Sequence, residues 1–564
     1  MAIERRQLRA ATLFVPLALA WSACTGQIGA SPAGGAVGTA GAGGNVSPPA
    51  GAACQPDRSF ASPRLWRLND QQYVNVVHDV FGAGITVPVD VSAAVIAGAE
   101  EPTAAAALAV DDQNVAQNFM RTAAATAGSA VAGANLRALL PCATPDAACV
   151  ETFIRTKVAR AFRRPVTADE VTGMLALYQL GAMDGPSAGV QTLMQYVLQA
   201  PPFLWRTELA GFDPAKPSSA PQPLSPFELA SALSFLFLDS VPDDALWAKA
   251  TDGSLTTPSV LAAEVDRLLA LPAVKANIAT KVGGWLSIHK TAVTVKDPAV
   301  FPQFTPAVQA ALTDSAQRFL QDVVNQGTLR DLVTSDRLFV NHDLAALYGL
   351  PPVTGTDLVA VKTGLPQWSG GILTQPALLA ANARPDKGDP IHRGLFIYSA
   401  MVCGATLPPP PGNAASVDAS LPATATERER ANFRESRADC STCHGRFDPL
   451  GLLTERYDPL GRYVETDAAG KPIDQSATIA LGNNLDGPTN GLPELITRLQ
   501  SSRQFADCAS GMLANIAAGR LVTEDHSCAL RDVQDGFATT PSFMGLFRAI
   551  ATSPAFARRD SQLP

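Results

Sequence analysis

A chain of 564 residues with 47% hydrophobic side chains is too long for one ordinary core, so we expect several domains, roughly three to five. Its 43 basic and 51 acidic residues give a formal net charge of -8, and the basic residues form no extended cluster along the sequence. This balance excludes a protein that binds a nucleic-acid backbone, because such a protein needs clustered positive charge.

Residues 1–23 have the pattern of a bacterial lipoprotein signal peptide. Three arginines within the first nine residues precede a short apolar run at 10–20, and small residues lead up to Cys24. The run is too short to span a bilayer permanently. We expect Cys24 to be the lipidated first residue of the mature chain, with plain secretion and an uncleaved anchor as the alternatives. Thr25, where aspartate would favour the inner membrane, indicates an outer-membrane lipoprotein that faces the periplasm or the cell surface.

Stretches rich in glycine, alanine, proline and serine divide the rest of the chain. Residues 24–62 contain almost no large apolar groups, so we expect a disordered tether. Shorter stretches of this kind lie at 213–223, 408–411 and 482–492. The predicted domains are helical over 63–137, 138–212, 224–365 and 492–564, and a further domain covers 366–481.

Signals for helix starts recur along these domains. Three pairs have the spacing of a capping box, in which a polar cap and the third helical residue bind each other's backbone. They are Asn69 with Gln72, Thr167 with Glu170, and Ser225 with Glu228. Asn341 has the position of a further cap, and strand-like alternation is scarce. The predicted fold class is mainly α, in several domains.

One motif carries recognisable chemistry. Cys440-Ser441-Thr442-Cys443-His444 has the form C-x-x-C-H. On a helical turn both sulfurs can bond the vinyl groups of one haem, and the histidine can ligate its iron. Export agrees with this, because bacteria attach haem c after export. We therefore expect one covalent haem c and a cytochrome-c-like domain over 366–481. A simple disulfide, a redox dithiol and half of a zinc site are the alternatives.

A near-repeat follows the motif, at residues 448–451 and 458–461. Both copies read Asp-Pro-Leu-Gly, which favours a type I turn. Around these turns we expect apolar side chains to line the haem pocket, and one arginine to form an ion pair with the haem propionates. The apolar candidates are Phe447, Leu450, Leu452, Leu453 and Tyr457, and the basic ones are Arg446, Arg456 and Arg462.

The sequence does not determine which residue is the second axial ligand of the iron. His392 is the first candidate, because it follows a predicted loop and precedes an apolar helix, and Met512 is the next. The remaining candidates are Met401, Met544 and His526. A methionine or histidine in this position favours electron transfer, whereas an open position lets the iron bind a small ligand.

Six further cysteines would lie in an oxidising compartment, where disulfides persist. Cys142 and Cys149 are close in sequence and are expected to pair. Cys508 and Cys528 flank a helix and its turn, and are the second expected pair. Cys54 and Cys403 are left over, and spacing alone does not fix the connectivity.

The chain resembles large exported proteins of planctomycetes and myxobacteria that are built from modules known as domains of unknown function, with a cytochrome-c-like motif near the end. The resemblance rests on short stretches in the family's order, from residue 63 to nearly the end. They are 67–73 (RLNDQQY), 161–165 (AFRRP), 229–236 (LASALSFL), 370–375 (GGILTQ), 392–394 (HRG) with the prolines at 408–411, the C-x-x-C-H motif with both Asp-Pro-Leu-Gly copies, 518–520 (AGR) and 551–556 (ATSPAF). It implies an exported, haem-bearing surface protein and no particular substrate.

These observations favour a membrane-anchored c-type cytochrome that transfers electrons. One alternative is a haem-dependent oxidase, peroxidase or dehydrogenase subunit that acts on an extracellular polymer. The other is a surface binding or scaffold lipoprotein without haem. We expect a redox partner of unknown identity, membrane attachment through the N-terminal lipid, and no nucleic acid. No signature of a serine hydrolase, a P-loop, a zinc protease or a dinucleotide site is present, so no catalytic residue is predicted.

Overall fold

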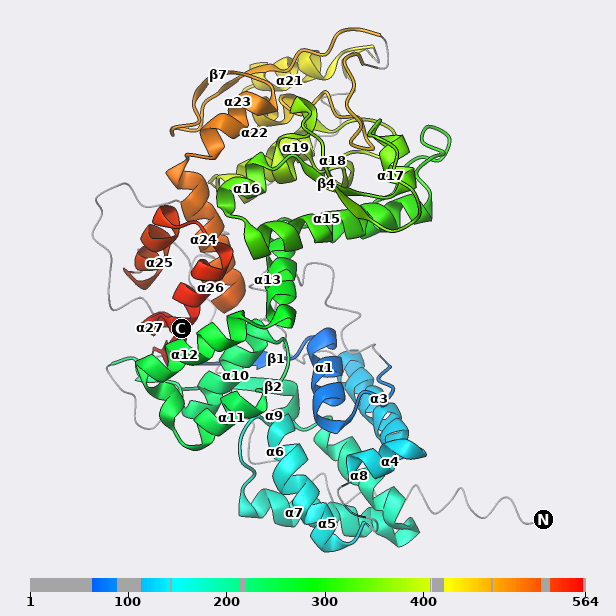
Figure 1. Cartoon of the computed structure of the whole chain (residues 1–564), viewed down its shortest axis with the longest axis vertical. Helices are drawn as coiled ribbons and strands as arrows, with labels where there is room; N and C mark the ends of the chain where they lie inside the picture. The colour runs from blue at the N-terminus through cyan, green and yellow to red at the C-terminus, as the bar shows by residue number, and fades with distance from the viewer. Residues whose placement is uncertain are drawn as a thin grey trace, which may run out of the picture. The chain divides into compact units, whose positions relative to one another are not determined.

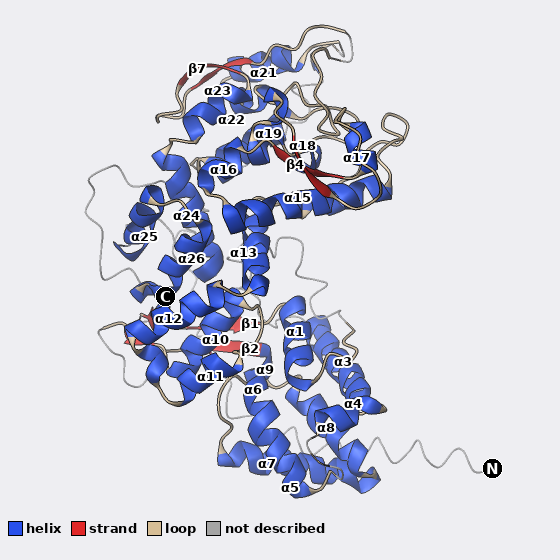
Figure 2. Cartoon of the chain, in the orientation of Figure 1, coloured by secondary structure: helices blue, strands red, loops and turns tan. Residues whose placement is uncertain are grey.

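The computed structural model describes residues 63–88, 113–140, 142, 145–213, 220–405, 407, 420–422, 424–467, 470–518 and 528–560. Within these ranges the chain is mainly helical, which confirms the predicted class (Figures 1 and 2). The strands there form four short antiparallel pairs, β1–β2, β3–β8, β4–β5 and β6–β7. None of the helices in these ranges combines the length and the apolar character that crossing a bilayer requires.

The N-terminal helices surround one core. This core is built from buried side chains between Leu68 and Leu204, with Phe235 and Val241 added to it. Its elements are β1 (Arg64–Arg67), α1 (Asp70–Phe81), α3 (Gln113–Ala130), α4 (Ala134–Leu139), α5 (Ala147–Phe153), η3 (Ile154–Val158), α6 (Ala159–Ala161), α7 (Ala168–Gly181), η4 (Ala182–Asp184), α8 (Pro186–Val197), α9 (Pro201–Leu204) and β2 (Trp205–Glu208).

A second core runs from Ala210 to Phe556. Its first elements are β3 (Gln222–Pro223), α10 (Pro226–Phe237), α11 (Asp244–Thr251), η5 (Ser254–Thr256), α12 (Pro258–Leu269), α13 (Pro272–Trp285), α14 (Lys290–Val293), α15 (Pro306–Gln326), α16 (Leu329–Thr334), β4 (Arg337–Val340), α17 (His342–Leu347), β5 (Val359–Lys362), η6 (Pro366–Trp368) and η7 (Gly371–Thr374). Because Phe447 and Leu450 belong to the same cluster as Leu338, the segment around the C-x-x-C-H motif shares its core with these helices.

The remaining elements carry the motif and the C-terminal helices. They are α18 (Pro376–Ala381), α19 (Pro390–Phe396), η8 (Ile397–Met401), α21 (Glu427–Ser436), α22 (Ser441–Leu452), β6 (Ser476–Ile479), β7 (Gly487–Asn490), α23 (Leu492–Leu499), α24 (Arg503–Ala518), α25 (Cys528–Thr539), α26 (Phe543–Thr552), α27 (Pro554–Ala557) and β8 (Arg558–Arg559).

The predicted helix caps are all present. The side chains of Asn69, Thr167 and Ser225 each accept a hydrogen bond from the backbone three residues on, and each bond is returned as a capping box. Asn341 caps α17 by accepting from the backbone N–H of Leu344 at 3.0 Å. Local hydrogen bonding therefore sets these helix starts, as the sequence predicts.

A buried ion cluster joins segments far apart in the sequence. Glu208 on β2 accepts from Arg64 Nε on β1 at 2.8 Å and from Arg559 Nε on β8 at 3.0 Å. Burial alone would raise the pKa of Glu208, but the guanidinium groups of Arg559 and Arg64 hold it well below its usual range. An uncompensated charge at this depth would strongly destabilise the fold, so the three side chains depend on one another.

Helices α19 and α22 touch backbone to backbone. A Cβ atom added at Gly451 would overlap the carbonyl oxygen of Pro390, and one added at Gly394 would overlap that of Phe447. The two contacts run in opposite directions along the helices, so α19 and α22 pack antiparallel. Glycine is required at both positions because no larger residue leaves room for the opposing backbone.

Replacing Gly451 by alanine should therefore destabilise the protein by about 3 kcal/mol, since backbone at the crossing cannot move aside as a side chain would. Thermal unfolding measured by circular dichroism tests this value. Gly445→Ala in the same helix is the matched control. Nothing lies within 4 Å of a Cβ atom there, and alanine favours a helix over glycine by up to about 1 kcal/mol. Equal melting temperatures for the two variants would contradict the prediction.

Candidate functional site

The C-x-x-C-H motif occupies the first turn of α22. Cys440 is the N-cap residue, and the backbone N–H of His444 donates to its carbonyl at 3.0 Å. Cys440 is buried and Cys443 is partly buried, and neither sulfur is in a disulfide. The helix therefore places two free thiols and an imidazole within one turn and a half.

His444 is held by a buried carboxylate. Its Nδ1 donates to Asp448 Oδ1 at 3.0 Å, one turn further along α22. The other oxygen of Asp448 accepts from Arg434 Nε on α21 at 2.8 Å. The side chain of Asp448 is completely buried and that of Arg434 is 3% exposed. The spacing of four residues between His444 and Asp448 is the sequence signal for this contact, whereas the Asp-Pro-Leu-Gly pattern predicts Asp448 only as a turn residue.

The two copies of Asp-Pro-Leu-Gly adopt different structures. The second is the predicted turn, in which Asp458 accepts from the backbone N–H groups of Leu460 and Arg462, each at 2.9 Å. The first was wrongly predicted as a turn, because residues 448–451 continue α22 with Pro449 inside the helix. Tertiary contacts decide the difference, since Asp448 binds Arg434 and His444 instead of its own backbone.

The candidates for a second axial ligand are dispersed. His392 lies in the first turn of α19, where Asp389 caps the helix, and its Nδ1 donates to Asp389 Oδ2 at 2.6 Å. That hydrogen bond raises the pKa of His392, whose side chain is 66% exposed. Met401 is fully buried at the end of η8, while Met512 on α24 and Met544 on α26 are partly buried in the second core. His526 lies outside the described residues.

The three arginines proposed for the propionates have different surroundings. Arg446 is exposed on α22. Arg456 Nη1 donates to the hydroxyl of Tyr463 at 3.0 Å, and Arg462 pairs with Asp458 at 2.7 Å. Arg446 alone of the three projects into solvent from the helix that carries the motif.

A different arginine, which is not among the residues predicted for the site, holds the site together. Arg393 on α19 is buried and donates to the carbonyl of Leu379 at 3.0 Å and to that of Asp458 at 2.8 Å. It donates to Tyr457 O at 2.5 Å as well. One guanidinium thus joins α18, α19 and the second Asp-Pro-Leu-Gly turn. Its signal in the sequence is the stretch 392–394, which contributes to the family resemblance.

Glu455 is a partly buried residue beside this arginine. Its Oε1 is enclosed and has no hydrogen-bond partner among the residues that the structure describes. Burial raises the pKa of Glu455 from its usual 4.5 to about 7, and Arg393 lowers it only in part. The nearby carboxylates of Glu427 and Asp389 raise it further, and Arg428 opposes them.

The stability of the fold should consequently decrease as the pH rises from about 5 to about 7. In that window the folded state keeps a proton on Glu455 that the unfolded chain has released, and each unit of pKa difference is worth about 1.4 kcal/mol. Urea unfolding at pH 5 and pH 8 measures the effect. Glutamine at position 455 cannot titrate. Between pH 5 and pH 8 we therefore expect Glu455→Gln to lose about 2 kcal/mol less unfolding free energy than the wild type. An identical pH dependence in both proteins would refute this role.

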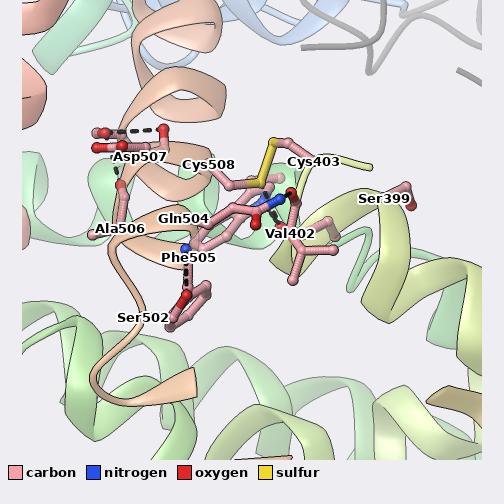
Figure 3. Close-up of a disulfide and its surroundings, with 12 residues drawn as sticks. Ser399, Val402, Cys403, Ser502, Gln504, Phe505, Ala506, Asp507 and Cys508 are labelled. Atoms are coloured by element: carbon pink, nitrogen blue, oxygen red, sulfur yellow. Dashed lines mark hydrogen bonds between the residues drawn. A yellow bond between two sulfur atoms is a disulfide. The ribbon is translucent and has the colours of Figure 1, made fainter. Parts of the chain in front are cut away.

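Two disulfides join cysteines that are both described. Cys142 pairs with Cys149, as expected from their spacing. Cys403 at the end of η8 pairs with Cys508 on α24 across a Cα–Cα distance of 5.4 Å (Figure 3). The expected Cys508–Cys528 pair is therefore wrong, and Cys403 is not left over for Cys54.

The packing of α24 against η8 explains this pairing. Gln504 Nε2 donates to the carbonyl of Val402 at 2.7 Å, and Cys508 Sγ lies 3.4 Å from the carbonyl oxygen of Ala400 (Figure 3). Cys508 thus faces η8, a segment more than 100 residues earlier in the chain. Cys528 is in a disulfide too, but not with Cys508.

The fold and the motif define the class of protein: helical modules arranged in series, one of which carries a C-x-x-C-H helix. Three family models match the chain, each described as a protein of unknown function. They are PSD5 (DUF1595) over residues 149–208, PSD4 (DUF1592) over 224–350 and PSCyt3 (DUF1588) over 369–467. The chain is thus a multi-module protein built from domains of unknown function, as the resemblance implied. No curated protein and no solved structure matches it.

Proposed function

We propose that the protein is a membrane-anchored c-type cytochrome that carries one covalent haem and transfers electrons. The observation that carries this proposal is the first turn of α22, where two unpaired thiols and a histidine have the C-x-x-C-H spacing. The module that contains this turn matches PSCyt3, a name that suggests a cytochrome-like domain.

The donor set fits haem c. Cys440 and Cys443 would form the thioethers, since both sulfurs are free and lie on one helical turn. Because Nδ1 of His444 is bound to Asp448, the Nε2 nitrogen is left to act as the iron ligand. When bound, the haem would supply a one-electron couple. Within the described ranges no three His, Cys, Asp or Glu side chains gather as they would around a bare metal ion.

The proposed location follows from the N-terminal sequence. Lipidation at Cys24 would anchor the chain in the outer membrane, facing the periplasm or the cell surface, and residues 25–62 would separate the folded part from the lipid. Cys24 and these residues lie outside the described ranges. The proposed partner is a protein or a small molecule that donates or accepts single electrons.

A haem stain on a denaturing gel tests the proposal, with protein produced in a host that exports and matures cytochromes c. We expect a stained band at the mass of the chain plus one haem. An unstained band would overturn the proposal. Spectra of the reduced protein with and without carbon monoxide test the proposed electron transfer. Rapid carbon monoxide binding would favour the haem enzyme over the electron carrier.

A further inference from the structure

The contacts of Asp448 exceed what a structural ion pair requires. Its side chain is completely buried, and its two oxygens serve different partners. Oδ2 accepts from Arg434 Nε at 2.8 Å, whereas Oδ1 accepts from His444 Nδ1 at 3.0 Å. One oxygen thus binds the neighbouring helix, and the other binds the proposed iron ligand.

The position of Asp448 is unfavourable by itself. It precedes Pro449 within α22, and a residue before proline is disfavoured in helical conformation. A buried charge adds a desolvation penalty of several kcal/mol. A carboxylate at this position is therefore stable only through its contacts with Arg434 and His444.

The hydrogen bond fixes the tautomer of His444. A carboxylate has only acceptors, so the hydrogen must lie on Nδ1 and the lone pair on Nε2. The ring of Phe447 packs against the imidazole, with the two centroids 4.9 Å apart. Both contacts restrict the orientation of the ring, as hydrogen-bond partners of metal-ligating histidines do.

We infer that Asp448 is a positioning residue that lowers the reduction potential of the iron bound by His444. The inference depends on the proposed haem attachment. A negatively charged acceptor at Nδ1 makes the imidazole a stronger electron donor, which stabilises ferric over ferrous iron. Reduction adds one electron from an external donor and neither makes nor breaks a bond. Arg434 faces Asp448 from α21, so the pair itself is neutral.

The test is the midpoint potential of the full-length, haem-loaded protein, measured by spectroelectrochemistry. Asp448→Asn keeps an acceptor oxygen near Nδ1 but removes the charge. We expect the equilibrium constant for reduction to rise at least tenfold, which corresponds to about 59 mV for one electron. The matched control is Asp486→Asn between β6 and β7, where the carboxylate accepts from the backbone N–H groups of Leu481 and Gly482, and its potential should equal that of the wild type.

A second variant covers the case in which Asp448→Asn does not fold. Asp448→Asn combined with Arg434→Gln removes both charges of the buried pair. Its net charge equals that of the wild type, and its potential should still be higher because the hydrogen bond to His444 has lost its ionic acceptor. A haem-loaded double variant with the wild-type potential would overturn the positioning role alone. A wild-type protein without haem would overturn the proposed function, and the positioning role with it.

Discussion

Alanine at both Cys440 and Cys443 should abolish covalent haem retention while leaving the fold intact. The two thioethers are the proposed bonds to the porphyrin, and a haem held by His444 alone would be lost on denaturation. The fold should tolerate the change, because neither sulfur takes part in a disulfide. The measurement is the haem stain of a denaturing gel, together with circular dichroism of the same preparation.

The control for this prediction changes the two variable positions of the motif. Ser441→Ala with Thr442→Ala keeps both cysteines and His444, and should retain the full stain. A stained band from the variant without cysteines would show that the haem is bound elsewhere. Loss of the stain from the control variant as well would point to a failure of maturation and would remove the support for thioethers at these two positions.

Serine at both Cys403 and Cys508 should destabilise the module around α22 and α24 by about 5 kcal/mol. The sequence separation between the two cysteines is 105 residues. In the chain-entropy model, cross-linking a loop of about 100 residues lowers the conformational entropy of the unfolded chain. This stabilises the folded state by roughly 4.7 kcal/mol. Hydrogen exchange of peptides that cover α24, measured across a urea series, reports this loss locally.

Removal of the other disulfide is the matched control. Cys142 and Cys149 are only 7 residues apart, so serine at both positions should cost about 2 to 3 kcal/mol by the same model. Removal of the Cys403–Cys508 bond, which closes the longer loop, must cause the larger loss of stability. If removal of the Cys142–Cys149 bond were the more damaging change, local strain rather than loop closure would govern both bonds.

Local signals in the sequence predicted the helices well. Each capping box needs only residues within one turn of each other, so Asn69 and Gln72 specify a helix start without help from the rest of the chain. The scarcity of alternating patterns correctly predicted a mainly helical protein. The C-x-x-C-H spacing likewise places both thiols and the imidazole on one turn of α22.

Contacts between distant segments could not be predicted in the same way. The tetrapeptide Asp-Pro-Leu-Gly forms a turn at 458–461 but continues a helix at 448–451. In the helix, Asp448 binds Arg434 and His444. The partner of Cys508 depends on how α24 packs against η8, which no pattern near Cys508 reveals. Arg393 depends likewise on carbonyl groups more than 60 residues away.

The ion cluster at Glu208 has a consequence for how the chain is made. Its partner Arg559 is synthesised 351 residues after Glu208, whereas Arg64 precedes Glu208 by 144 residues. Domains generally fold in the order in which they emerge, yet here Glu208 can pair early with Arg64 but gains its second arginine only after Arg559 has been synthesised. A nonsense mutation shortly before residue 559 should therefore leave an early-made segment incomplete, and a chaperone or protease could distinguish truncated from finished chains by that segment.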